Sequence, residues 1–288
     1  MSFNADQVIE AFETAKEENA LDKYREAQVV KLPADREVWM TGDLHDHRSN
    51  FRKLLKAADL GNNPQRHLIL HELIHGDHYD QQGAEDSWQM LFQAAELKID
   101  YPDQVHFLFA NHDLAQIHGE GIMKGGLSVC EAFNDAVTRD FGSRAATVQV
   151  AITEFLLSLP LAVRAPNGLF FCHSLPPDEQ IPGFDFTVFE RDALTANDYK
   201  RKTGPVYQLI WGRKVTPAGV EQFAQKVGAD IIITGHQPQE SGYAVNGPRH
   251  LIIASDHNQG VFLRLNTTDK FDMQGILARM KKYVTLET

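Results

Sequence analysis

Residues 37–61, EVWMTGDLHDHRSNFRKLLKAADLG, join an apolar run to an amphipathic one through a short polar turn. The run EVWMT is typical of a β-strand, and Gly42-Asp43 is a plausible end for it. The second half predicts a helix that Ser49 or Asn50 caps and that Gly61 ends. A strand, a polar turn and a helix in this order are the repeating unit of α/β proteins.

The same alternation continues along the chain. Helices are predicted over residues 5–27, 84–99, 147–159, 217–229 and 272–283, and strands over 67–73, 104–109, 168–173 and 230–234. Residues 250–257 and 260–265 are expected to form a late hairpin-like pair. We therefore expect one α/β domain over residues 1–288, with a helical extension to about residue 35, a core over about 36–266 and a C-terminal helix over about 271–284.

Composition narrows the class of protein. The 288 residues are 43% hydrophobic, carry a net charge of −11 and include only two cysteines, Cys130 and Cys172. An acidic surface repels polyanions, which argues against nucleic acid as a partner. Two cysteines form neither a disulfide framework nor a thiolate zinc cluster, which suits a reducing compartment. The N-terminus is polar, and no apolar run is long enough to span a membrane, so we expect a cytoplasmic protein without a membrane partner.

Side chains able to bind metals follow five of the apolar runs. In open α/β sheets the ligand site lies beyond the carboxyl ends of the strands, so clusters far apart in sequence can meet there. The clusters are Asp43-Leu44-His45, Gly76-Asp77, Asn111-His112-Asp113, His173 and Gly235-His236.

The donor types in these clusters suit two divalent metal ions. Carboxylates, imidazoles and one amide, without thiolates, fit Mn, Fe, Zn or Co. Six donors exceed what one catalytic metal takes, whereas two metals that share a carboxylate would use them all. Such a pair favours displacement at phosphorus and lowers the pKa of a shared water. His112 could then protonate the leaving oxygen, with Asp80 holding its tautomer. The six donors are Asp43, His45, Asp77, Asn111, His173 and His236.

His71-Glu72-Leu73-Ile74-His75 also matches H-E-x-x-H, the pattern of zinc proteases. On a helix, His71 and His75 would share one face beside Glu72, and Glu96 could be a third ligand. No downstream motif supports Glu96, and a pattern with two free positions arises often by chance in a chain with thirteen histidines. We expect instead a short strand that ends between His71 and Leu73, followed by a loop.

The ordered set of clusters resembles the calcineurin-like metallophosphoesterase superfamily. That pattern runs G-D-x-H, G-D-x-x-D, G-N-H-E/D, a lone His and G-H. Within it, residues 209–213 (LIWGR), 235–243 (GHQPQESGY) and 251–260 (LIIASDHNQG) are most similar to the phosphoprotein phosphatase (Ser/Thr phosphatase-like) branch. The segments that carry the resemblance are residues 42–47 (GDLHDH), 76–80 (GDHYD), 110–113 (ANHD), 172–174 (CHS) and 235–238 (GHQP).

The resemblance implies a four-layer α/β/β/α sandwich and a role for each matched residue. Asp43 and His45 would hold one metal, and Asp77 would bridge both. His112 would be the general acid, oriented by Asp80, and Arg213 would bind a phosphate oxygen. The second metal would be completed by Asn111, His173 and His236.

The chain differs from that pattern at three positions. Asp46 replaces a glycine, and Gln81 and Phe109 replace two phosphate-binding arginines. The absence of these two arginines leaves the metal ligands intact but affects which substrate the site can bind. The cations that could compensate are Arg48, Arg139, Arg144 and Lys124.

The sequence therefore predicts a dinuclear metal-dependent phosphoesterase, with manganese among the candidate metals. Its substrate would be a phosphate ester, either a phosphoprotein or a small molecule, cleaved as by a Ser/Thr phosphatase-like phosphomonoesterase. The nearest alternative is a nucleotide polyphosphate hydrolase of the diadenosine tetraphosphatase type. A zinc protease and an inactive scaffold are more remote alternatives.

Overall fold

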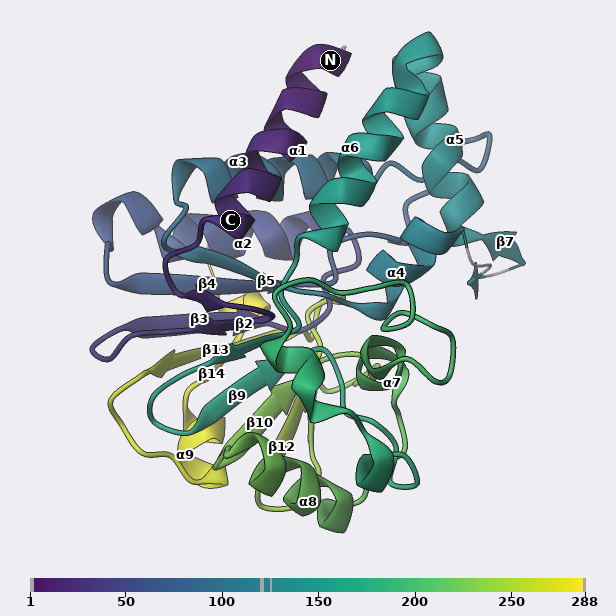
Figure 1. Ribbon diagram of the computed structural model, residues 1–288. Coiled ribbons are helices and arrows are strands. Elements are labelled where there is room, and N and C mark those ends of the chain that lie inside the picture. Colours follow the sequence, from purple (N-terminus) through teal and green to yellow (C-terminus); the bar gives the residue numbers. More distant parts are fainter. Residues whose placement is uncertain (1–2, 120–121, 125, 287–288) are drawn as a thin grey trace.

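Two β-sheets lie face to face between layers of helices in the computed structural model, which describes residues 3–119, 122–124 and 126–286 (Figure 1). This arrangement confirms the expected α/β/β/α sandwich. The apolar side chains of both sheets meet in a buried layer that includes Val38, Met40 and Ile69 from one sheet and Phe171 and Ile233 from the other. Strands covered on both faces read as continuous apolar runs, as the central strands do here.

The first sheet has five strands in the order β14-β13-β3-β4-β5. Its strands β3 (Glu37–Thr41), β4 (Arg66–His71) and β5 (Val105–Leu108) are parallel. Strand β13 (Val261–Asn266) runs antiparallel to β3, and β14 (Met280–Lys282) antiparallel to β13.

The second sheet has seven strands in the order β1-β2-β8-β9-β10-β12-β11. Parallel pairing joins β9 to β10 and β10 to β12. Its strands are β1 (Arg25–Glu26), β2 (Val29–Lys31), β8 (Ala162–Arg164), β9 (Leu169–Cys172), β10 (Ile231–Thr234), β11 (Tyr243–Val245) and β12 (His250–Ile253). A separate two-stranded ribbon consists of β6 (Met123–Lys124) and β7 (Leu127–Ser128).

Most helices lie over the five-stranded sheet, and α7 and α8 lie on the side of the seven-stranded sheet (Figure 1). The α-helices are α1 (Ala5–Ala20), α2 (Arg48–Ala58), α3 (Trp88–Asp100), α4 (Asn111–His118), α5 (Val129–Phe141), α6 (Ala145–Leu157), α7 (Pro205–Trp211), α8 (Pro217–Val227) and α9 (Met273–Ala278). Short 3-10 turns are η1 (Leu60–Asn62), η2 (Gly142–Arg144), η3 (Ile181–Gly183), η4 (Phe186–Glu190) and η5 (Tyr283–Thr285).

Several expected boundaries are corrected at the ends of the chain. Helix α1 ends at Ala20, short of the expected residue 27: Asp22 lies in a buried ion pair with Lys98, and β1 and β2 follow. The C-terminal helix is shorter than expected, since residues 280–282 pair with β13. Very short strands of this kind depend on distant partners and leave little local signal.

Two further expectations are wrong in detail. Strands β12 and β13 do not form a hairpin, because β12 belongs to the seven-stranded sheet and β13 to the five-stranded one. Helix α2 begins two or three residues earlier than expected, with His47 as its cap: the His47 ring accepts from Asn50 N–H. Among the described residues, no helix combines the length and apolar character needed to cross a membrane.

Candidate metal centre

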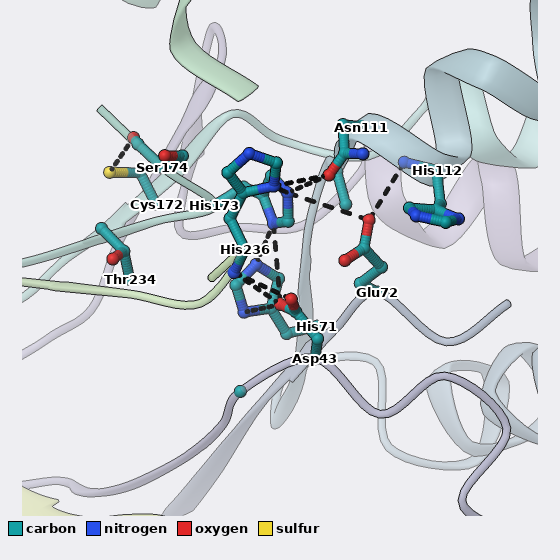
Figure 2. Close-up of polar contacts among 12 residues, drawn as sticks. Asp43, His71, Glu72, Asn111, His112, Cys172, His173, Ser174, Thr234 and His236 are labelled. Atoms are coloured by element: carbon teal, nitrogen blue, oxygen red, sulfur yellow. Dashed lines mark hydrogen bonds and ion pairs between the residues drawn. The ribbon is translucent and has the colours of Figure 1, made fainter. Parts of the chain in front are cut away.

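A cavity of about 260 Å³ lies beyond the carboxyl ends of β3 and β4, where loops from both sheets meet. Its position is the one expected for a ligand site in a parallel sheet. Helix α4, which follows β5, and the loop after β10 complete it, and His173, which follows β9, contacts the lining residues Asn111 and His236 (Figure 2). The lining residues are Asp43, His45, Glu72, Asp77, Asn111, His112, Arg213, His236, Gln237, Pro238, Ala254 and Asp256.

Strand register brings Glu72 beside Asp43. The parallel pairing of β3 and β4 sets Met40 opposite Ile69, and the same offset continued by three residues sets Asp43 opposite Glu72. Strand β4 ends at His71, within the interval predicted from the sequence, so Glu72 is the first residue beyond it. Both carboxylates therefore enter the cavity from neighbouring strand ends.

Glu72 lies between the two groups of predicted metal ligands. Its Oε2 is 3.4 Å from Nε2 of His45. Its Oε1 is 3.8 Å from Nε2 of His173 and accepts the backbone N–H of His112 at 3.0 Å. The Glu72 side chain is almost completely buried, which suits a ligand held between two ions better than a solvated surface group.

A second group of donors converges on the other side of Glu72. The Oδ1 atom of Asn111 is 2.6 Å from Nε2 of His173 and 2.8 Å from Nδ1 of His236. Those two ring nitrogens are 3.1 Å apart (Figure 2). Three donors that point at one another in this way are arranged to bind a common cation.

In two of the ligand histidines, the ring nitrogen that does not face the other donors already has a hydrogen-bond partner. Nδ1 of His45 lies 2.9 Å from the Ile74 carbonyl, so it carries the proton and leaves Nε2 free to bind a metal. Nδ1 of His173 lies 2.6 Å from Nε2 of His71. Contacts of this kind fix the ring orientation of metal-binding histidines. His71 therefore contacts the site through His173 and also lies near Asp43, with its Nδ1 3.7 Å from Oδ1 of that residue.

Burial sets the charges in the cavity. It raises the pKa of Asp43 to about 7, and burial together with the Asp43 charge raises the pKa of Glu72 well above its ordinary value. Burial lowers the pKa of His236 to about 3 and that of His173 well below its usual range. Neutral imidazoles are competent metal ligands, and a bound cation would offset the cost of two buried carboxylates. The donor chemistry thus fits divalent metal ions.

Two residues with predicted roles lie elsewhere than those roles require. Asp77 is exposed and lies at the edge of the cavity, whereas Glu72 holds the central position expected for Asp77. Asp80 accepts from Nη1 of Arg139 at 2.6 Å and from two backbone N–H groups of its own loop. Nδ1 of His112 instead lies 2.9 Å from Nδ1 of His75. The sequence reasoning missed Glu72 and His75.

Gly76 has a structural reason to be glycine. A Cβ atom there would lie 2.6 Å from Cβ of Asp46 and 2.8 Å from the His45 carbonyl oxygen. The Asp46 side chain is itself occupied by an ion pair with Arg48. Gly76 thus allows the close approach of two loops.

The remaining predicted residues are placed as follows. Arg213 lines the cavity, and its Nε donates to Nε2 of His236 at 3.0 Å. Among the candidate compensating cations, Arg48 pairs with Asp46 and Asp86, Arg139 with Asp80 and Asp140, and Arg144 with Asp6. The side chain of Lys124 lies outside the described residues. Arg213 is therefore the one Lys or Arg among the described residues that line the cavity.

The zinc-protease arrangement is wrong for this chain. Residues 66–71 are a strand paired on both sides, and the backbone after it turns through left-handed conformations at Glu72 (φ 38°) and His75 (φ 63°). A helix that would put His71 and His75 on one face is not formed.

A family model for calcineurin-like phosphoesterases matches residues 37–240. The chain is a member of this family. It is therefore a hydrolase that acts on phosphate esters, and its family uses divalent metal ions.

Solved phosphatase structures share the fold of this calcineurin-like phosphoesterase. A protein serine/threonine phosphatase from Saccharomyces cerevisiae with similarity to human phosphatase PP5 superposes with a TM-score of 0.72 at 14% identity, covering 99% of this chain and 91% of that one. A cold-active protein-tyrosine phosphatase from a psychrophilic Shewanella species gives a TM-score of 0.55 at 17% identity, covering 87% and 79%. At these identities the likeness concerns the fold alone.

The family pattern also fits the chain in a second register. G-D-x-x-D was matched to residues 76–80, but residues 71–75 have the same spacing, with Glu72 in place of the first carboxylate and His75 in place of the second. One signal for this register was present in the sequence. The run Leu68-Ile69-Leu70 is followed directly by polar residues, as the run before Gly42-Asp43 is.

Proposed function

We propose that this calcineurin-like phosphoesterase is a dinuclear metal-dependent phosphomonoesterase. The observation that carries the proposal is the meeting of six donors from five strand ends: five of them line one cavity beside Arg213, and the sixth, His173, contacts Asn111 and His236. In this proposal Asp43, His45 and Glu72 hold one metal, and Glu72 is shared with the second. The second metal is completed by Asn111, His173 and His236.

When bound, the two metals would act as Lewis acids toward the phosphoryl group and lower the pKa of a coordinated water. The donor set lacks thiolates and mixes carboxylate, amide and imidazole groups, which suits manganese, iron, zinc or cobalt, and manganese is the ion used in the tests below. Arg213 would bind a phosphate oxygen, a task that suits the planar guanidinium group.

His112 would act as the general acid. Its backbone N–H is fixed on Glu72 at 3.0 Å, and its ring lines the cavity from the first turn of α4. As the bond between phosphorus and the ester oxygen breaks, the leaving oxygen would take a proton from the His112 ring. The chain's own residues thus bind the phosphoryl group on one side and supply the proton on the other.

The cavity favours a substrate whose leaving group extends outward. Its volume of about 260 Å³ is slightly below the range typical of sites that enclose a drug-sized ligand. The described lining residues include no Phe, Tyr or Trp on which a nucleobase could stack. Phosphoproteins or small phosphomonoesters therefore fit this site better than dinucleoside polyphosphates.

A substrate panel tests the proposal. The purified chain, loaded with Mn²⁺, is assayed with an aryl phosphate, phosphoserine and phosphotyrosine peptides, a dinucleoside polyphosphate, a phosphodiester and a peptidase substrate. We expect two metals per chain and the highest kcat/KM on a monoester. Preferred cleavage of the dinucleoside polyphosphate or the diester would refute the substrate class. Peptidase activity, or a folded chain that binds no metal, would refute the mechanism.

A further inference from the structure

His75 is a fully buried histidine that contacts the proposed general acid. Its Nδ1 lies 2.9 Å from Nδ1 of His112, with the two ring centroids 5.1 Å apart. Its backbone has φ 63°, a conformation that is uncommon outside glycine. The His75 N–H donates to Ser87 Oγ at 3.0 Å, and Ser87 Oγ donates to Glu85 at 2.8 Å. The backbone conformation of His75 and its hydrogen bond to Ser87 therefore hold the ring in position.

A chain of amides sets the direction of the hydrogen bonds around His75. Nε2 of Gln116 donates to Oδ1 of Asn134 at 2.9 Å, so Oε1 of Gln116 faces the other way. That Oε1 lies 2.9 Å from Nε2 of His75 and can only accept. Nε2 of His75 must then carry the proton, which leaves Nδ1 of a neutral His75 as an acceptor for His112.

We propose that His75 is a positioning residue that holds His112 with a proton on Nδ1. The inference rests on the proposed function, in which His112 is the acid. In the step itself His112 starts doubly protonated, and its Nε2 gives a proton to the ester oxygen, which receives the electron pair of the breaking P–O bond. The oxygen of a water that has lost a proton to solvent forms the new P–O bond, and His112 is left neutral with its proton on Nδ1. A neutral imidazole backed by Gln116 takes the place that a carboxylate holds in the G-D-x-x-D pattern.

Two substrates separate this role from a purely structural one. An aryl phosphate has a good leaving group and needs little help from an acid, whereas an alkyl phosphate needs a full proton. For His75→Leu we expect kcat on the alkyl phosphate to fall by about 10²-fold, with a fall of less than about 5-fold on the aryl phosphate and little change in KM. His75→Asp, which restores an acceptor, should recover most of the loss.

Matched variants keep the test decisive. Gln116→Met removes the acceptor for His75 while leaving the His75 ring in place, and we expect a selective loss of about 10-fold on the alkyl phosphate. His118→Gln, at the exposed end of the same helix, should leave both rates unchanged. Equal losses on both substrates for Gln116→Met, or no loss on either, would overturn the proposal. The result for Gln116→Met decides the question even if His75→Leu fails to fold or loses metal.

Imidazole ¹⁵N NMR of the metal-free full chain tests the hydrogen bonds without using activity. We expect His112 protonated at Nδ1 and His75 at Nε2 at neutral pH, with the His75 pattern lost in Gln116→Met. A neutral His112 protonated at Nε2 alone would overturn the proposal. This spectrum needs no substrate, so it separates the two proposals. A chain that cleaves no phosphate ester but shows the expected tautomers would refute the phosphomonoesterase function and still support the hydrogen bond between His75 and His112.

Discussion

At the scale of single residues, the two buried carboxylates Asp43 and Glu72 are the main electrostatic cost of the site. Burial raises the pKa of Asp43 to about 7, and burial together with the neighbouring Asp43 charge raises the pKa of Glu72 well above its ordinary value. Buried like charges are costly unless cations lie beside them. The surrounding imidazoles are held neutral by their own burial, so the charge that balances this pair is expected to come from bound metals.

The role of His112 gives a prediction at this scale. His112→Asn should lower kcat by about 10²–10⁴-fold, because the ring that protonates the leaving oxygen is lost. Both metals should remain, since the backbone N–H that holds Glu72 is unchanged. Steady-state kinetics and metal analysis on the same sample check this. A variant with unchanged kcat, or one that has lost its metals, would contradict the assignment.

Gly235 gives a second prediction, because it lies against the ligands. A Cβ atom at this position would be 2.2 Å from Oδ1 of Asp43 and 2.6 Å from Cε1 of His71. Gly235→Ala should therefore displace Asp43 and weaken metal binding by roughly 10–100-fold, the range seen when support of a ligand is lost.

Gly183→Ala is the matched control, since a Cβ atom there meets nothing within 4 Å. Competition with a fluorescent metal chelator measures both affinities. Equal metal affinity in the two variants would show that the packing around Asp43 is not needed for binding.

At the scale of elements, the strand ends that carry most ligands could be predicted from the sequence. Apolar runs followed by polar clusters marked the ends of β3, β9 and β10, and the structure brings their ligands together. The turn after β4 could not be predicted in the same way. The sequence predicted that β4 ends between His71 and Leu73, but it did not predict the left-handed turn at Glu72, whose carbonyl accepts from His45 N–H at 2.9 Å. Such support comes from another loop and leaves no local signal.

The opposite ends of β4 and β5 give a prediction about pH. Nδ1 of His67 lies 2.9 Å from Nε2 of His106, whose Nδ1 lies 2.9 Å from Asp22, and Lys98 pairs with the same carboxylate. Burial, with a further contribution from His106, lowers the pKa of His67 to about 3 from a usual value of 6.5. Below about pH 6.5 the unfolded chain binds a proton at His67 that the folded chain does not.

The free energy of unfolding should therefore fall as the pH falls from 6.5 toward 3, by about 1 kcal/mol per pH unit from this group. His67→Phe removes the titrating group, so its stability should depend less steeply on pH between 7 and 5, even if it is lower at pH 7. Urea unfolding at several pH values measures both slopes. Parallel slopes for the variant and the wild type would rule out His67 as a source of acid sensitivity.

At the scale of the whole molecule, the site joins the two sheets. Asp43 and Glu72 follow strands of the five-stranded sheet, and His173 and His236 follow strands of the seven-stranded sheet. Metals bound between them would hold the sheet edges together and stabilise the folded state by mass action. The family match and the shared fold establish a phosphoesterase, while the identity of the shared ligand decides how the metals are held.

Metal content of two carboxylate variants tests that claim most directly. Wild-type protein, Glu72→Gln and Asp77→Asn are saturated with Mn²⁺, freed of excess metal by gel filtration and analysed by mass spectrometry, with circular dichroism as the check on folding. We expect two metals per chain in the wild type and in Asp77→Asn, and fewer than one in Glu72→Gln, because Glu72, unlike Asp77, lies between the two donor groups. Two metals retained in Glu72→Gln, with loss in Asp77→Asn, would contradict the account.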